Sequence, residues 1–130
     1  MVIDTSALIA LLGMEREATR LAAAIEADSV RLICAATIVE AGVVIEARYG
    51  AEGGRDLDLL IAKGGMTVEP LTAEHADVAR VAWRRYGKGR HPAGLNLGDC
   101  FSYALAKTSG EPLLFKGEDF RQTDVIAVTY

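Results

Sequence analysis

Hydrophobic and polar positions follow two different repeats along the chain. Short, mostly apolar runs predict five buried strands, at 1–4, 30–34, 66–70, 112–115 and 125–128. Apolar residues at helical spacing predict six helices between them, at about 6–12, 16–27, 36–49, 55–63, 72–86 and 99–107. A Gly- and Pro-rich loop is predicted at 87–98. Strands that alternate with helices are typical of an α/β fold, in which helices cover both faces of a mostly parallel sheet.

The helix predicted at 36–49 is apolar on almost every side. Ile38, Val39, Val43 and Ile45 lie at different angles around it. Such a helix is either buried on several sides within one subunit or packed on a second subunit. We therefore expect a homodimer through helix 36–49, with burial inside one subunit as the alternative.

The composition is that of a globular protein. The 130 residues are enough for a single domain, 1–130, with one core, and 51% of them are hydrophobic. No apolar run approaches the ~20 residues of a membrane span, and no basic leader precedes the first strand. We expect a cytoplasmic protein without membrane contact. Cys34 and Cys100 are too few for a disulfide scaffold and are expected to be buried.

The charge is unevenly distributed. A net charge of −4 argues against non-specific binding of nucleic acid. The segment 80–91 nevertheless contains basic residues and no acid, namely Arg80, Arg84, Arg85, Lys88 and Arg90. This run is either a solvated helix face or a phosphate-binding surface, and a second feature is needed to distinguish the two.

Several acidic residues occur in unusually apolar surroundings. Asp4 directly follows the first predicted strand, Glu40 interrupts the apolar helix, and Asp99 begins the last helix. Glu118 and Asp119 follow the strand at 112–115. The carboxyl ends of parallel strands form the usual ligand site of such sheets. Unpaired buried carboxylates cost several kcal/mol or take up a proton.

A divalent cation would neutralise such a group of acids. Few basic residues are near them in sequence, and carboxylate oxygens without nearby His or Cys favour Mg²⁺ or Mn²⁺ over zinc. Each acid also has a simpler explanation when taken alone. Asp99 is a possible helix cap, and Asp119 a possible turn residue.

Four segments resemble the VapC-type toxins of the PIN-domain ribonuclease family: "MVIDTSALIALL", "TIVEAGVVIEARYG", "LNLGDCFSYALAK" and "PLLFKGEDFRQTDV". The resemblance implies a PIN-like three-layer sandwich with a sheet of four to five strands. It implies an Mg²⁺-dependent endoribonuclease with Asp4, Glu40 and Asp99 as catalytic, metal-coordinating acids. Its products would carry a 5′-phosphate and a 3′-hydroxyl, with water as the nucleophile.

The fourth acid of the family departs from the usual pattern. The common Thr-x-Asp-x-x-Phe segment has Phe115 and Gly117 at its two polar positions here. The resemblance therefore implies Asp119 as the fourth metal-binding, catalytic acid, with Glu118 as the substitute.

Other roles are also implied by the resemblance. The hydroxyls of Thr5, Ser6 and Thr37 would hold the acids or bound water, with helix capping as the alternative for Thr5. Asn96 would order the loop before Asp99 and hydrogen-bond a carboxylate. Four aromatic residues at helical spacing are expected in the core rather than as base-stacking platforms, namely Trp83, Tyr86, Phe101 and Tyr103.

The resemblance also implies two partners, an RNA substrate and a cognate VapB-type antitoxin that silences the toxin. A basic or apolar antitoxin segment would compete with metal and RNA for the acidic pocket. Six basic residues are candidates to guide the RNA backbone: Arg80, Arg84, Arg85, Lys88, Arg90 and Lys116.

Three other functions are compatible with parts of the pattern. A phosphatase of the haloacid-dehalogenase type needs a second Asp where Ser6 stands. A receiver-like phosphoryl-binding module needs paired acids after the first strand, although Lys116 loosely fits its late Lys. A catalytically degenerate PIN domain that only binds RNA or a partner remains open because of the altered fourth acid.

Overall fold

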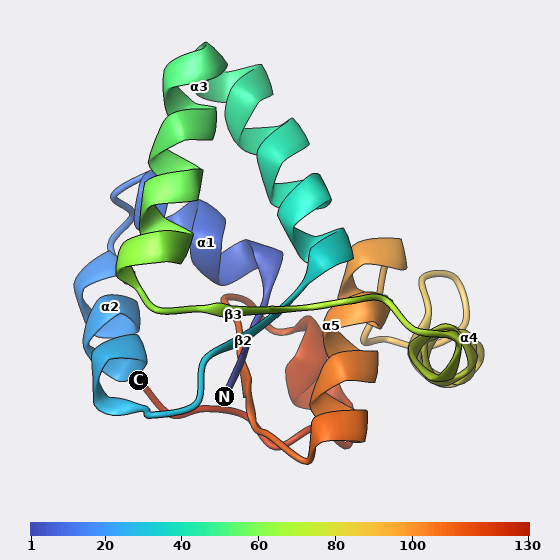
Figure 1. Cartoon of the computed structure of the whole chain (residues 1–130). Helices are drawn as coiled ribbons and strands as arrows, with labels where there is room; N and C mark the ends of the chain where they lie inside the picture. The colour runs from blue at the N-terminus through green and yellow to red at the C-terminus, as the bar shows by residue number, and fades with distance from the viewer.

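The computed structural model describes residues 1–130 and contains a four-stranded parallel sheet covered by helices (Figure 1). The strands lie in the order β3-β2-β1-β4. Their bounds are Val2–Ile3 (β1), Leu32–Cys34 (β2), Thr67–Glu69 (β3) and Leu113–Leu114 (β4). The helices are α1 (Thr5–Leu12), α2 (Ala18–Ala27), α3 (Ala35–Lys63), α4 (Ala73–Tyr86) and α5 (Leu97–Ser109), followed by the 3-10 turn η1 (Asp119–Gln122). The predicted α/β fold is confirmed.

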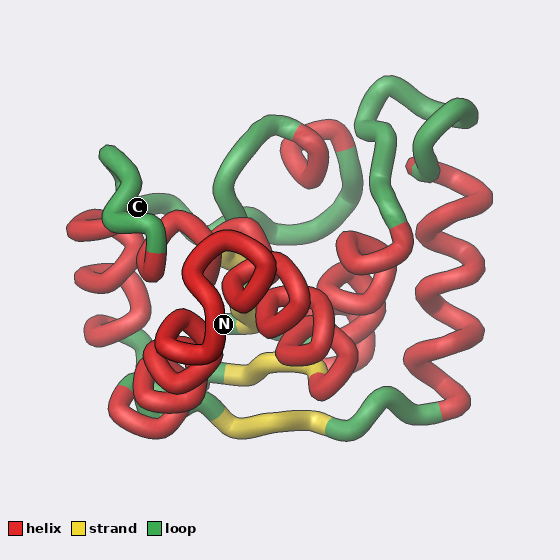
Figure 2. The backbone as a smooth tube through the Cα atoms, turned by 90° about the horizontal axis from the view of Figure 1, so that it is seen from above, coloured by secondary structure: helices red, strands yellow, loops and turns green.

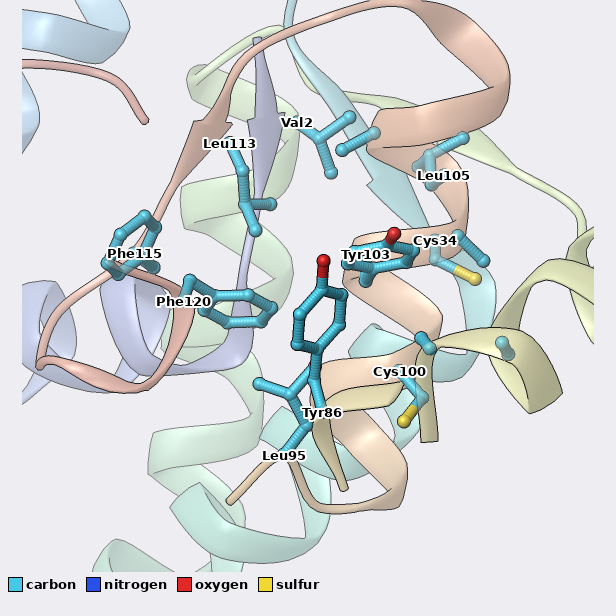
Figure 3. Packing of buried hydrophobic residues seen from close by; sticks show 14 of the residues in the cluster. Val2, Cys34, Tyr86, Leu95, Cys100, Tyr103, Leu105, Leu113, Phe115 and Phe120 are labelled. Carbon is cyan, nitrogen blue, oxygen red and sulfur yellow. The ribbon is translucent and has the colours of Figure 1, made fainter. Parts of the chain in front are cut away.

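Two hydrophobic cores lie on opposite faces of the sheet. Successive strand residues alternate between them, because neighbouring side chains of a strand point to opposite faces. Ile3 joins the core built with α1, α2 and the long α3, whereas Val2 joins the core built with α4 and α5. In Figure 3 the rings of Tyr86, Tyr103 and Phe120 lie together in the second core, beside Val2. The predicted three layers are therefore present.

The two helices predicted at 36–49 and 55–63 form the single element α3, which is bent at Gly50. Gly50 has φ 68° and ψ −163°, a conformation that almost only glycine adopts. The two arms of α3 therefore run back along each other as a hairpin (Figure 1). Gly53 allows their close approach, because a Cβ there would clash with Ile45 and Tyr49.

The helix 36–49 is less buried than its composition predicts. Ala41 is buried in the first core and Ile45 is also buried, but Val39 and Val43 each remain 67% exposed. Burial inside the chain therefore accounts for only part of its apolar surface. The exposed valines are compatible with the expected homodimer, which stays a proposal.

One predicted strand is absent, and several element boundaries differ from the sequence prediction. The segment 125–128 is not a strand, because it makes only an isolated bridge between Ala127 and Leu113. The last helix begins at Leu97 rather than at Asp99, because Asn96 supplies the N-cap. None of the helices combines the length and hydropathy that crossing a membrane requires.

One aromatic prediction is wrong. Tyr86 and Tyr103 are buried and Phe101 is half-buried, but Trp83 on α4 is 42% exposed. Figure 2 shows α4 as the helix at the right edge of the molecule, reached from β3. Trp83 therefore lies at the periphery of the fold, not in its core.

Candidate active site

Asp4 lies at the carboxyl end of β1 and caps the N-terminus of α1. Its Oδ2 accepts hydrogen bonds from the Ser6 amide at 2.9 Å and from Ser6 Oγ at 2.6 Å. The residue is only 1% exposed, and its Oδ1 has no hydrogen-bond partner. A buried carboxylate oxygen without a partner is unfavourable, so this atom is suited to a ligand.

Glu40 reaches the same end of the sheet from the first arm of α3. The hydroxyl of Thr5 donates to its Oε2 at 2.7 Å. Thr5 therefore holds an acid, and the helix cap is Asp4 rather than Thr5. The Glu40 carboxylate packs directly on Gly98, where a Cβ would overlap it.

Asp99 lies in the first turn of α5, in a reciprocal capping arrangement with Asn96. The Asn96 amide donates to Asp99 Oδ2 at 2.8 Å, and the Asp99 amide donates to Asn96 Oδ1 at 2.9 Å. Burial raises the pKa of Asp99 to about 7, and the charges of Asp4, Asp119 and Glu40 add to the increase. The charges of these three acids therefore act on Asp99, and the prediction that all four acids form one site stays a prediction.

Asp119 is the candidate for the fourth acid whose charge acts on Asp99. It begins η1 and is held in place by the next residue, Phe120, which is buried against Phe115. Glu118 is exposed and forms an ion pair with Arg121 at 3.3 Å. Only the charge of Asp119 acts on the pKa of Asp99.

The acids do not form a closed metal cluster, since no three acidic, His or Cys side chains are close enough to hold an ion together. Their chemistry still fits a hard dication. The donors are carboxylate oxygens, Asp4 Oδ1 has no partner, and burial together with the acidic neighbours raises the pKa of Asp99 to about 7. Carboxylate oxygens that could bind a dication are thus present at this end of the sheet.

Thr37 contacts a hydroxyl group rather than an acid. Its buried hydroxyl is 3.4 Å from Ser102 Oγ on α5 and has no hydrogen bond to a carboxylate. The alternative role, binding of metal-bound water, stays a prediction. The contact of Thr37 joins α3 to α5.

Lys116 is engaged by acidic residues rather than free. Its ammonium group pairs with Glu15 and, at 3.4 Å, with Glu17. Its amide donates to Ser6 Oγ at 2.9 Å, the same hydroxyl that donates to Asp4. Lys116 therefore connects the exit of β4 to the exit of β1.

Some residues of the basic run form ion pairs, and others line a groove. Arg85 lies 3.8 Å from Asp124, and Arg80 lies 3.8 Å from Asp77. Arg84 and Arg90 have no acidic partner, and with Arg80 they line a groove between α4 and α5. Lys88 is exposed in the loop after α4.

Two features of the site were missed by the sequence analysis. Gly98 was assigned to a loop, although its position directly before Asp99 was a signal of close packing. Tyr103 donates a hydrogen bond of 2.7 Å to Asp124, which anchors the segment after η1 to α5. No local pattern indicates that second contact, because it joins residues from different elements.

Comparisons with known proteins identify the family. The family model of the PIN domain matches residues 1–126. Ribonuclease VapC30 of Mycobacterium tuberculosis is 58% identical over 128 residues, covering 98% of each chain. Ribonuclease VapC of Mycolicibacterium smegmatis is also 58% identical, covering 98% of this chain and 99% of the relative.

Solved structures share the fold at lower identity. The crystal structure of Mycobacterium tuberculosis VapC20, described as a toxin that cleaves the sarcin–ricin loop, has a TM-score of 0.80 at 19% identity. It matches 98% of this chain and 97% of its own. A toxin–antitoxin complex from Klebsiella pneumoniae has a TM-score of 0.73 at 20% identity, with coverage of 99% and 97%. The chain therefore belongs to the PIN domain family and, within it, to the VapC group.

Proposed function

We propose that this protein is the toxin of a type II toxin–antitoxin pair and acts as a metal-dependent endoribonuclease. The relatives at 58% identity are named ribonucleases and match the chain over nearly its whole length. The observation that carries the proposal is the buried Asp4 carboxylate, which keeps one oxygen without a partner while its charge acts on Asp99. Perturbed acids of this kind are typical of catalytic sites.

We propose Asp4, Glu40 and Asp99 as metal ligands and Asp119 as the fourth acid. Mg²⁺ is the expected cation, and Mn²⁺, which accepts the same oxygen donors, is expected to substitute for it. When bound, the cation polarises the scissile phosphate and the attacking water. Ser6 and Thr5 keep the Asp4 and Glu40 carboxylates oriented through their hydroxyl groups.

The proposed reaction is hydrolysis of an RNA phosphodiester. Water attacks phosphorus, the bond to the 3′-oxygen breaks, and the products carry a 5′-phosphate and a 3′-hydroxyl. Asp99 is our candidate to accept the proton of the water, because its carboxylate lies in the first turn of α5 and the charges of the other three acids act on it. The 3′-oxygen takes its proton from solvent.

The substrate must approach an acidic site in a chain of net charge −4. We propose that the basic run supplies the attraction, with Arg84, Lys88 and Arg90 as its main contacts, because none of these has an acidic partner. Arg80 and Arg85 contribute less, since each lies near an acid. Lys116 is the weakest of the predicted contacts because Glu15 and Glu17 neutralise it.

Cleavage of total RNA by the purified, antitoxin-free protein tests the activity. We expect cleavage with added Mg²⁺ or Mn²⁺ and none with a chelator. Asp4→Asn and Asp99→Asn should each lose more than the roughly 10- to 100-fold that removing an outer-shell partner of a metal site costs. Asp58→Asn, an exposed acid on the second arm of α3, is the matched control and should cleave normally.

Two results would reject the ribonuclease. Equal residual cleavage by wild type, Asp4→Asn and Asp99→Asn would identify a contaminant. Tight RNA binding without metal-dependent cleavage would favour the degenerate PIN domain that only binds its partner.

We further propose a VapB-type antitoxin as the inhibitor and a homodimer as the functional form. A basic antitoxin segment would complement the four acids electrostatically. Co-expression with a small neighbouring gene product, followed by purification through a tag on either chain, tests the antitoxin. Val39 and Val43 are the candidate contacts of the dimer, because they form the exposed apolar side of α3.

A further inference from the structure

An apolar groove with a basic rim lies between α4 and α5, on the face away from α3. Its volume is about 640 Å³, within the usual range of ligand sites. Its apolar lining includes Ala76, Ala79, Cys100 and Phe101, of which Ala79 and Cys100 are buried. This groove is the second feature that the basic run needed to be more than a solvated helix face.

Trp83 is the largest side chain that lines the groove. Its indole is 42% exposed, and the Arg90 guanidinium lies over its ring at 4.2 Å from the centroid. The indole also packs tightly on Gly87, where any Cβ would clash with it. Gly87 and Arg90 therefore hold the indole of Trp83 in a fixed orientation at the surface.

The charged residues that line the groove are all basic. Arg80, Arg84 and Arg90 line it, and no acid does. Arg84 and Arg90 form no ion pair within the chain. An apolar lining with an arginine rim complements a ligand that has a flat apolar part and negative charges at its edges.

The groove adjoins the acidic site around the first turn of α5. Leu97, Cys100 and Phe101 face the groove, whereas Gly98 and Asp99 lie on the opposite side of the helix by the 3.6-residue repeat. The two sites are therefore separated by about one helix diameter, ~10 Å. A chain that passes over this turn can occupy both.

We infer that this groove binds a nucleobase of the RNA substrate, which stacks on Trp83 while Arg84 binds an adjoining phosphate. The inference rests on the proposed ribonuclease function and adds a binding subsite to it. Bases stack on aromatic rings and on guanidinium planes whatever their identity, and arginines on a rim neutralise the backbone. The base would belong to an unpaired nucleotide close to the cleaved phosphate.

The single tryptophan of the chain allows a direct measurement. Trp83 fluorescence is titrated with an unstructured RNA oligonucleotide, with the same backbone lacking its bases, and with a fully paired RNA duplex. A chelator and the Asp99→Asn background keep the RNA intact. We expect quenching and tight binding with the first probe only, because stacking requires an accessible base.

Variants separate stacking from simple charge attraction. Trp83→Ala should weaken binding of the oligonucleotide by roughly tenfold, measured by fluorescence anisotropy of labelled RNA, and Trp83→Phe should restore most of it. Val81→Ala, an exposed apolar residue of α4 outside the groove, is the control and should bind normally. Arg84→Gln should reduce the salt dependence of binding, whereas the exposed Arg55→Gln on α3 should not.

Several results would overturn the inference. They are equal affinity for the oligonucleotide and its base-free backbone, unchanged RNA affinity in Trp83→Ala, and a Trp83→Ala effect confined to oligomer mass or antitoxin binding. The last result would assign the groove to a protein. Because binding is measured without cleavage, a failed ribonuclease assay leaves this test valid, and a failed binding test leaves the ribonuclease intact.

Discussion

At the scale of single residues, Asp4 answers the main question raised by the sequence. A carboxylate is retained between a buried strand and an apolar helix because it caps that helix with Oδ2 and leaves Oδ1 available. The sequence pattern and the family resemblance predict that Asp4, Glu40, Asp99 and Asp119 meet; the charges of the other three act on the pKa of Asp99, and their meeting at one ion stays a prediction. The contact of Thr37 could not be predicted, since its partner Ser102 is 65 residues away.

Asp99→Asn should make the metal-free protein more stable above neutral pH. The folded state keeps the Asp99 proton up to about pH 7, whereas the unfolded chain loses it at about pH 4. The folded wild type therefore loses stability as pH rises through this range. The variant should gain about 1–3 kcal/mol of unfolding free energy at about pH 8 and much less at about pH 5.

Urea denaturation at both pH values, with a chelator present, measures this difference. Asp77→Asn, which removes an exposed acid, should show no such pH dependence. A gain for Asp99→Asn that is the same at both pH values would contradict the proposed cause.

Gly98→Ala should disable the site without unfolding the protein. The added methyl group overlaps the Glu40 carboxylate, which must move away from Asp99. We expect ribonuclease activity to fall by about 10- to 100-fold, as for other displaced partners of metal sites. Gly42→Ala, where the nearest atom is 3.9 Å away, is the matched control and should remain active with the same circular dichroism spectrum.

At the scale of elements, the presence and order of the helices were predicted more accurately than the residues at which they begin and end. The order of strands and helices followed from the apolar periods, but 125–128 makes only one bridge because an apolar run does not by itself provide a pairing edge. The start of α5 was placed too late because Leu97 and Gly98 were read as loop residues. Asn96, three residues before the predicted start at Asp99, caps the helix and decides where it begins.

Gly50→Ala should destabilise the protein through the hairpin of α3. Alanine rarely adopts φ 68° with ψ −163°, and conformations of this kind cost on the order of 1–3 kcal/mol. Thermal unfolding should therefore show a lower midpoint. Gly42→Ala lies inside a regular helical arm and should leave the midpoint unchanged or raise it, since alanine is favoured there. Equal effects of the two substitutions would exclude the bend as the cause.

At the scale of the whole molecule, the fold presents two kinds of surface around one acidic end of the sheet. The first arm of α3 exposes an apolar side at Val39 and Val43, and α4 with α5 encloses the groove at Trp83. The apolar composition of helix 36–49 predicted an apolar surface there, and the homodimer through it stays a proposal. The sequence pattern could not indicate the groove, because residues of two helices form it and Trp83 has the same spacing as a core residue.

Val43→Glu should convert a dimer into a monomer. A charge at the centre of an apolar contact is left without a partner and disfavours association by several kcal/mol. Sedimentation velocity of the wild type, the variant and a Val81→Glu control on α4 tests this expectation. A wild type that is already monomeric, or a Val43→Glu variant that stays dimeric, would remove α3 as the interface.

The hydroxyl of Ser6 is shared between Asp4 and the Lys116 amide. The ends of the central strand and of its neighbour β4 are thereby fastened at one atom, 110 residues apart in sequence. A displacement of the segment that leads from β4 to Asp119 would therefore also displace Ser6, and with it Asp4. We expect that removing this one hydroxyl group would alter the positions of both segments at once.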